Sequence, residues 1–203
     1  ACEHFSGDEC LSGRSPIHGS ECCSVTEAMY SYEWLISITG DPYWAEMLEK
    51  AAFNALPATI SPDMWSHQYD QISNQMQCVR FPDGKQPFDT NSEESHLFGL
   101  EPQYGCCTSN MGQGFPKLAL STFLHREGRV LSALSLPATL STEHYTVSLH
   151  TEYPFKNAFT YAIEAKESFT LSLPPSASYP LITYPSPFSA ALTVSTTKPR
   201  LSF

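Results

Sequence analysis

The sequence lacks several features that would each assign it to a class of protein. It has no apolar run of the roughly 20 residues that a membrane-spanning helix requires. Its 11 Lys and Arg residues are outnumbered by 21 Asp and Glu residues, and they form no basic patch. Because binding to a phosphate backbone depends on clustered positive charge, we expect no nucleic-acid partner. We also expect no membrane partner.

Positive charge is scarcest in the first part of the chain. Residues 1–125 hold 16 acidic and 5 basic residues, whereas residues 126–203 hold 5 acidic and 6 basic residues. Such an acidic first part is compatible with a neutral ligand such as a sugar, or with a bound cation. The first residues also show no basic segment followed by an apolar one. We therefore expect the chain to begin within a longer protein. We expect it to be soluble, and the sequence does not distinguish a secreted from a cytoplasmic location.

Cysteine is absent after residue 107, and Asn-x-Ser/Thr acceptor sites are absent throughout. The seven cysteines before that point include two adjacent pairs, Cys22-Cys23 and Cys106-Cys107. Adjacent cysteines are poorly placed to bridge each other without strain. This pattern favours metal or thiol chemistry over a disulfide scaffold, although buried structural cysteines would show the same pattern.

Residues 21–55 predict two helices joined by a short turn. Apolar side chains recur at helical spacing up to Thr39-Gly40, which ends the first helix. Asp41-Pro42 begins the second, because Asp is a preferred N-cap and Pro suits the first helical position. We expect this helix to end before Pro57. The pair is a helical hairpin of the kind found in bundles and α/α barrels.

The rest of the chain predicts an irregular stretch, one more helix and a strand-rich part. Residues 57–105 mix aromatic and amide side chains in a loop long enough to be functional. Residues 108–124 predict a helix capped by Thr108 or Ser109. After residue 126 the pattern changes to period two, typical of an antiparallel β-sandwich. The expected strands are 129–136, 145–151, 158–164, 168–173 and 190–195.

The cysteine pairs each precede or open a predicted helix, and Glu21 lies beside the first pair. If the two helix starts face each other, several thiols and one carboxylate converge on one point. Zn²⁺ accepts thiolate and carboxylate ligands in tetrahedral geometry. A coordinated thiol is deprotonated and can act as a nucleophile. The residues alone therefore indicate a metal site, a reactive thiol, or both.

Three motifs carry a resemblance to a known family. They are Glu21-Cys22-Cys23-Ser24, the hairpin with Gly40-Asp41-Pro42-Tyr43 and Glu49–Ala55, and Tyr104-Gly105-Cys106-Cys107-Thr108-Ser109-Asn110. Together they resemble the β-L-arabinofuranosidase family, glycoside hydrolase family 127. The resemblance extends over about residues 3–173 and includes Tyr153-Pro154-Phe155. Cys22 stands where the family usually has Thr.

The resemblance implies an α+β protein of more than one domain. Residues 1–125 would be the C-terminal part of an α/α barrel with a zinc and cysteine site, and residues 126–203 an incomplete antiparallel β-sandwich. It implies a retaining glycosidase that cleaves an arabinofuranoside or a related glycan. Glu21, Cys23, Cys106 and Cys107 would hold Zn²⁺, with Cys106 also the nucleophile.

The resemblance leaves the general acid/base open between two glutamates, Glu9 and Glu3, with Glu9 preferred because it lies in Gly-Asp-Glu. A glycosidase that retains the anomeric configuration needs its two catalytic groups about 5–5.5 Å apart. Substrate contacts are expected from the aromatic and amide side chains His67, Gln68, Tyr69 and Asn74. The alternatives to a hydrolase are an inactive carbohydrate-binding piece and a zinc-stabilised structural piece of the same scaffold.

Overall fold

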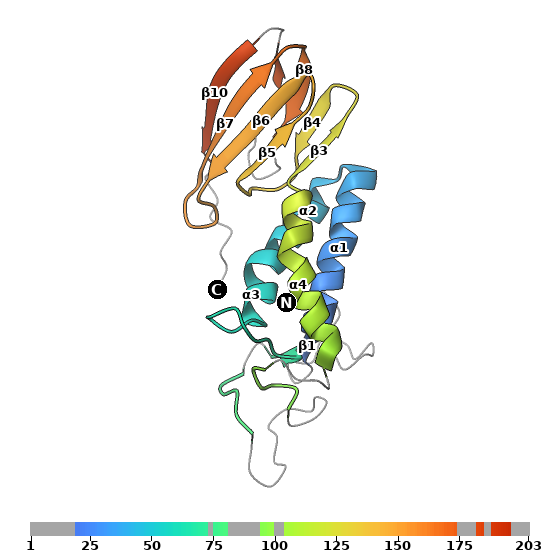
Figure 1. Cartoon of the computed structure of the whole chain (residues 1–203), viewed down its shortest axis with the longest axis vertical. Helices are drawn as coiled ribbons and strands as arrows, with labels where there is room; N and C mark the ends of the chain where they lie inside the picture. Colours follow the sequence, from blue (N-terminus) through green and yellow to red (C-terminus); the bar gives the residue numbers. More distant parts are fainter. Residues whose placement is uncertain are drawn as a thin grey trace. The chain divides into compact units, whose positions relative to one another are not determined.

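A computed structural model describes residues 19–72, 75–80, 94–99, 104–173, 182–184 and 188–195. It combines helices and sheets (Figure 1). The chain divides into two compact units, one formed by Ala1–Tyr32 with Met47–Lys117 and the other by Glu33–Glu46 with Leu118–Phe203. Within the described ranges, no helix is both long enough and apolar enough to cross a membrane.

The boundary between the first two helices falls where local sequence signals favour it. The helical elements are α1 (Cys22–Thr39), α2 (Pro42–Lys50), a π-helical turn (Ala51–Ala55), α3 (Leu56–Ala58) and α4 (Gly105–Leu120). Gly40 separates α1 from α2 at a φ of +65°, a conformation that glycine adopts without steric cost. Asp41 then caps α2, accepting a hydrogen bond from the Tyr43 backbone N–H at 2.9 Å.

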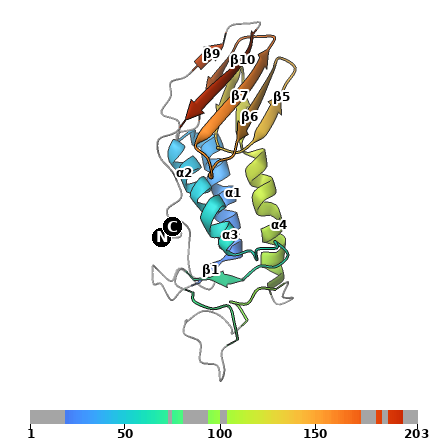
Figure 2. The same ribbon diagram turned by 90° about the vertical axis from the view of Figure 1, so that its left-hand side faces the viewer.

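The first unit buries apolar side chains between its helical segments. Its fully buried side chains come from α1, α2, the π-helical turn and α3, and include Val25, Met29, Leu48, Ala51, Ala52 and Leu56. Helices α1 and α4 lie side by side in both views (Figures 1 and 2). Among the contacts that join them, the Gln113 amide donates to Glu27 at 3.0 Å, and the Lys117 ammonium lies 3.7 Å from the centre of the Tyr30 ring.

In its described residues, the second unit contains two four-stranded sheets. Their strands are β3 (Phe123–Arg126), β4 (Arg129–Ser132), β5 (Ala138–Ser141), β6 (Tyr145–Thr151), β7 (Ala158–Ala165), β8 (Phe169–Ser172), β9 (Ile182–Tyr184) and β10 (Phe188–Ser195). One sheet has the order β10-β7-β6-β5 with every pair antiparallel. The other has the order β3-β4-β8-β9, in which β4 and β8 are parallel.

The two sheets contact each other through alternating buried side chains. Every second residue of β7 is buried, as expected of strands with one face in a core. The Tyr145 ring of β6 stacks on the Phe169 ring of β8 with centroids 4.5 Å apart. The Ser132 and Tyr161 hydroxyls, from β4 and β7, form a buried hydrogen bond of 2.9 Å. Both contacts link one sheet to the other.

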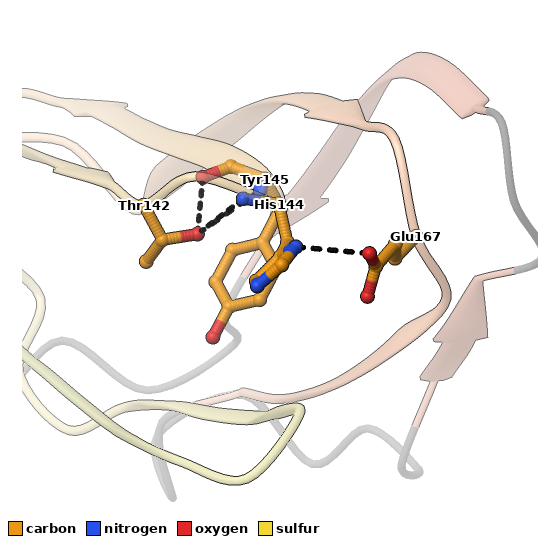
Figure 3. Close-up of polar contacts among 4 residues, drawn as sticks. All are labelled: Thr142, His144, Tyr145 and Glu167. Carbon is orange, nitrogen blue, oxygen red and sulfur yellow. Dashed lines mark hydrogen bonds and ion pairs between the residues drawn. The ribbon is translucent and has the colours of Figure 1, made fainter.

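A polar cluster fixes the turn before β6 (Figure 3). The Thr142 hydroxyl accepts hydrogen bonds from the backbone N–H groups of His144 and Tyr145, and donates to the Tyr145 carbonyl. The His144 Nδ1 atom lies 3.0 Å from a carboxylate oxygen of Glu167, in the turn between β7 and β8. The side chains of this pair are exposed, so we assign the turn's geometry mainly to Thr142.

Several element boundaries differ from the sequence predictions. The second helix does not end before Pro57, because a π-helical turn and α3 carry the helical path to Ala58. Helix α4 starts at Gly105, so the second cysteine pair lies inside a helix and not in a preceding turn. The strands β3, β5 and β9 were not predicted, and the parallel β4–β8 pair departs from an all-antiparallel arrangement.

Two glycines of α4 provide a test of how tightly the first unit is packed. A Cβ atom added at Gly114 would lie 2.8 Å from Leu56 Cδ2 and 3.3 Å from Thr26 Cγ2, whereas one added at Gly112 meets nothing within 4 Å. Overpacking costs about 1–3 kcal/mol and the better helix propensity of alanine returns at most about 1 kcal/mol. We predict that Gly114→Ala lowers the free energy of unfolding and that Gly112→Ala does not, as measured by urea denaturation. Equal effects of the two substitutions would contradict this packing.

Candidate functional site

A short two-stranded pairing holds the start of α1 in place. Strand β1 (Ser20–Glu21) pairs antiparallel with β2 (Asp70–Gln71), and the Cys22 backbone N–H donates to the Tyr69 carbonyl at 2.9 Å. Gly19 lies against the buried Asp70 side chain, whose Cγ atom would be 2.4 Å from any Cβ at position 19. Only glycine fits there without displacing this carboxyl group. The residues before α1 are therefore fixed to the segment 59–71.

The same segment also holds the start of α4. The Tyr69 ring stacks on the ring of Tyr104, the residue before α4, with centroids 4.4 Å apart. The His67 Nε2 atom is hydrogen-bonded to the Thr108 hydroxyl in the first turn of α4, at 2.9 Å. Burial lowers the pKa of His67, which favours the neutral ring. Segment 59–71 therefore contacts both helix starts that carry the cysteine pairs.

Three thiols meet between these two helix starts. The sulfur atoms of Cys23, Cys106 and Cys107 all lie within 4.8 Å of one another, and those of Cys23 and Cys107 are 2.9 Å apart. Cys107 is buried, Cys23 is half-buried and Cys106 is exposed. The group is thus closed on one side and open to solvent at Cys106. Thiols in such an arrangement can bind a metal ion.

Two neighbours of the group occupy different positions. Glu21 is buried, and its negative charge acts to raise the pKa of Cys23. In the described part of the chain, however, the Glu21 carboxylate is not one of the potential ligand atoms that lie within 4.8 Å of one another. Its role as a fourth ligand stays a prediction. Cys22 is fully buried, with its sulfur 4.0 Å from the Cys107 carbonyl oxygen and accepting a hydrogen bond from the Thr59 hydroxyl.

The thiols differ in how readily they lose their protons. Hydrogen bonding to Cys107 lowers the pKa of Cys23 from its ordinary value of 9.0 to about 7, and also lowers the pKa of Cys22. The same bonds keep the proton on Cys107 and raise its pKa, while burial raises the pKa of Cys106. Without a metal, the pKa shifts therefore favour a thiolate on Cys23 or Cys22 over one on Cys106 or Cys107.

The predicted substrate contacts lie close to the thiols but are largely enclosed. His67, Gln68 and Tyr69 are each at most 3% exposed. The Gln68 amide donates to the His96 carbonyl at 2.7 Å and to the Cys78 sulfur at 3.0 Å. Contact of these three side chains with substrate stays a prediction. The remaining predicted site residues, Asn74, Glu3 and Glu9, lie outside the described residues.

The sequence reasoning missed two polar side chains that contact the site. The Thr59 hydroxyl donates to Cys22, and the Asn110 side chain hydrogen-bonds the Cys106 carbonyl at 3.0 Å and helps to lower the pKa of Cys23. Asn110 could have been found, because residues four apart lie on one helix face. Thr59 gave no such signal, since its contact with Cys22 depends on how segment 59–71 folds back.

Solved structures of glycoside hydrolases share this fold. A β-L-arabinofuranosidase of family 127 from Geobacillus stearothermophilus T6 matches 89% of this chain and 32% of its own, with a TM-score of 0.72 at 13% identity. A family 127 β-arabinofuranosidase matches 85% of this chain and 26% of its own, with a TM-score of 0.64 at 19% identity. This chain therefore spans about a third or less of the length of these structures.

The sequence itself also matches a family model. The model of the catalytic domain of β-L-arabinofuranosidases of glycoside hydrolase family 127 matches residues 1–119. The chain belongs to this family, which confirms the resemblance carried by the cysteine and hairpin motifs. A search of curated protein sequences gave no significant match.

The unequal pKa values predict which cysteine reacts first in the metal-free chain. After removal of metal by a chelator, we expect alkylation of Cys23 by iodoacetamide to rise with pH through about 7 and then level off, because its thiolate is half formed there. Cys78, whose pKa is raised by burial, is the control and should keep accelerating above pH 9. Mass spectrometry of peptides measures both. The same pH profile for both cysteines would contradict the proposed charge distribution.

Proposed function

We propose that this chain supplies the zinc site and the cysteine nucleophile of a retaining glycoside hydrolase that acts on arabinofuranosides. One observation carries the proposal: Cys23 comes together with Cys106 and Cys107 from a distant part of the chain. Membership of the β-L-arabinofuranosidase family supports the substrate class.

The three thiols suit a zinc ion. Because a Zn–S bond is about 2.3 Å long, sulfur atoms that share one tetrahedral ion lie about 3.8 Å apart. The observed separations extend from 2.9 Å for Cys23 and Cys107 to at most 4.8 Å, so side-chain rotations that move Cys23 and Cys107 apart would give this spacing. Cys23, Cys106 and Cys107 would bind the ion, with Glu21 as the fourth ligand. When bound, zinc keeps coordinated thiols deprotonated at neutral pH.

Cys106 is placed to act on a substrate, because it is exposed while Cys107 is buried. In the proposed reaction the Cys106 sulfur attacks the anomeric carbon, and the carbon–oxygen bond to the leaving group breaks. A glutamic acid, Glu9 or alternatively Glu3, donates its proton to the departing oxygen. The resulting carboxylate then takes a proton from water, whose oxygen attacks the same carbon and releases the Cys106 thiolate. Two displacements retain the anomeric configuration.

The architecture proposed from the sequence fits this role. Residues 1–125 would form the C-terminal part of an α/α-barrel catalytic domain, and residues 126–203 a β-sandwich domain. The polar side chains His67, Gln68, Tyr69 and Asn74 would bind substrate. Support comes from the contact between His67 and Thr108, the residue that follows the cysteine pair.

A structural zinc site without catalysis is the second candidate. It is favoured by the sequence separation of Cys23 and Cys107, which are 84 residues apart, since a metal that links them would stabilise the fold. In this case the chain would bind zinc but would not hydrolyse a glycoside. Hydrolysis separates the two candidates, whereas metal binding does not.

Replacement of Cys106 tests the proposed nucleophile. We predict that the zinc-loaded chain hydrolyses an aryl β-L-arabinofuranoside, and that Cys106→Ala lowers kcat at least about 1000-fold, since nucleophile removal elsewhere costs this much or more. Cys78→Ser is the matched control and should keep full activity, because Cys78 lies outside the three-thiol group and serine keeps an acceptor for the Gln68 amide. Metal content is measured on all three proteins.

The outcomes distinguish the two candidates. Equal rates for the parent chain and Cys106→Ala would remove the nucleophile assignment. Stoichiometric zinc without any hydrolysis would favour the structural role. Removal of zinc by a chelator should abolish the hydrolysis, and added zinc should restore it.

A further inference from the structure

A tight loop immediately before His67 holds a tryptophan in solvent. The backbone N–H of Ser61 donates to the Ser66 carbonyl at 2.9 Å, and the Met64 N–H donates to the Ser61 carbonyl at 2.8 Å. The Asp63 carboxylate accepts from the Ser61 hydroxyl at 2.6 Å and from the Trp65 backbone N–H at 3.1 Å. The loop therefore has a defined conformation of its own.

Two features of this loop are energetically unfavourable: a backbone conformation that is strained, and large apolar side chains that are exposed to water. Met64 has a φ of +62°, in the left-handed region that non-glycine residues rarely occupy. Trp65 is 76% exposed and Met64 is 61% exposed. Strained residues persist where the surrounding structure fixes them, and they cluster at binding sites. A strained loop that presents an indole ring to water is thus a candidate binding element.

The loop leads directly into His67, which contacts the first turn of α4. Trp65 is two residues from His67, a separation that the backbone can extend over at most about 7 Å. His67 contacts Thr108, which directly follows Cys106 and Cys107. A ligand that reacts at Cys106 and extends past His67 by a further sugar unit would approach this loop.

We propose that Trp65 is a stacking platform for the sugar unit adjacent to the one that reacts at Cys106. The indole ring offers a large, rigid apolar face for the carbon–hydrogen face of a sugar, and an N–H donor at its edge for a hydroxyl group. The excess of acidic residues in the first part of the chain suits a neutral ligand. This inference rests on the proposed function, since it assigns a second sugar position to the same site.

Another exposed tryptophan provides a matched control. Trp34 is 55% exposed, but it lies within the regular helix α1 and belongs to the other compact unit. Single exposed apolar side chains of that kind are common and need no ligand. Comparison of Trp65 with Trp34 therefore separates a binding role from the general effect of losing a surface indole.

Calorimetric titration of two probes tests the proposal. The probes are methyl β-L-arabinofuranoside and a β-linked L-arabinofuranose disaccharide, titrated into the full chain carrying Cys106→Ala, so that neither is consumed. We expect Trp65→Ala to raise the Kd of the disaccharide about 10-fold or more and that of the methyl glycoside less than 2-fold. Trp65→Phe should retain most of the affinity, and Trp34→Ala should change neither Kd.

The results separate this inference from the proposed function. Binding of the disaccharide through Trp65 without hydrolysis by the Cys106-containing chain would support the platform and reject the hydrolase. Hydrolysis with a KM for the disaccharide that is unaffected by Trp65→Ala would overturn the platform alone. A parent chain that does not bind the disaccharide, or an equal loss of affinity for both probes, would also overturn it. Unchanged unfolding midpoints of the Trp65 variants verify that the fold is intact.

Discussion

The site depends on the way segment 59–71 joins two helix starts that are far apart in sequence. The Cys22 N–H bonds to the Tyr69 carbonyl, while the Tyr69 ring stacks on Tyr104. Each such contact contributes only about 1 kcal/mol, so the arrangement depends on their sum. The segment is itself secured, because the Gln68 N–H donates to the Thr59 carbonyl at 2.7 Å. Cysteines from both helix starts thereby reach one place, which is the condition for any shared metal ion.

The parts of the fold that depend on local rules were predictable from the sequence. The Asp41 cap and the left-handed Gly40 separate α1 from α2 as their residue types indicate. Strand β6, with its strict alternation, was predicted with its observed bounds. Strand β3 was not, since its four residues have only one buried side chain and follow a helical pattern. The parallel β4–β8 pairing joins residues that are far apart in sequence, so no local sequence pattern predicts it.

The candidate site was predictable in its residue types but not in its geometry. The two cysteine pairs predicted thiol or metal chemistry, and the structure groups Cys23 with Cys106 and Cys107. The position of the second pair inside α4 was not foreseen, because Gly105 indicated a turn and Thr108 or Ser109 a helix cap after the pair. Gly112, Gly114 and Pro116 also have low helix propensity. Burial against α1 and α3 outweighs those propensities, as the close approach of Gly114 to Leu56 shows. The division of charge among the thiols also required the folded structure, because it depends on contacts between distant residues.

The central claim is that cysteines from both helix starts hold one zinc ion, and X-ray absorption at the zinc edge tests it most directly. For the zinc-loaded chain we expect three sulfur neighbours at about 2.3 Å and one oxygen neighbour at about 2.0–2.2 Å. Cys23→Ser should remove one sulfur from this shell, and Cys78→Ser should remove none. A zinc shell of nitrogen and oxygen alone, or one unchanged by Cys23→Ser, would contradict the account.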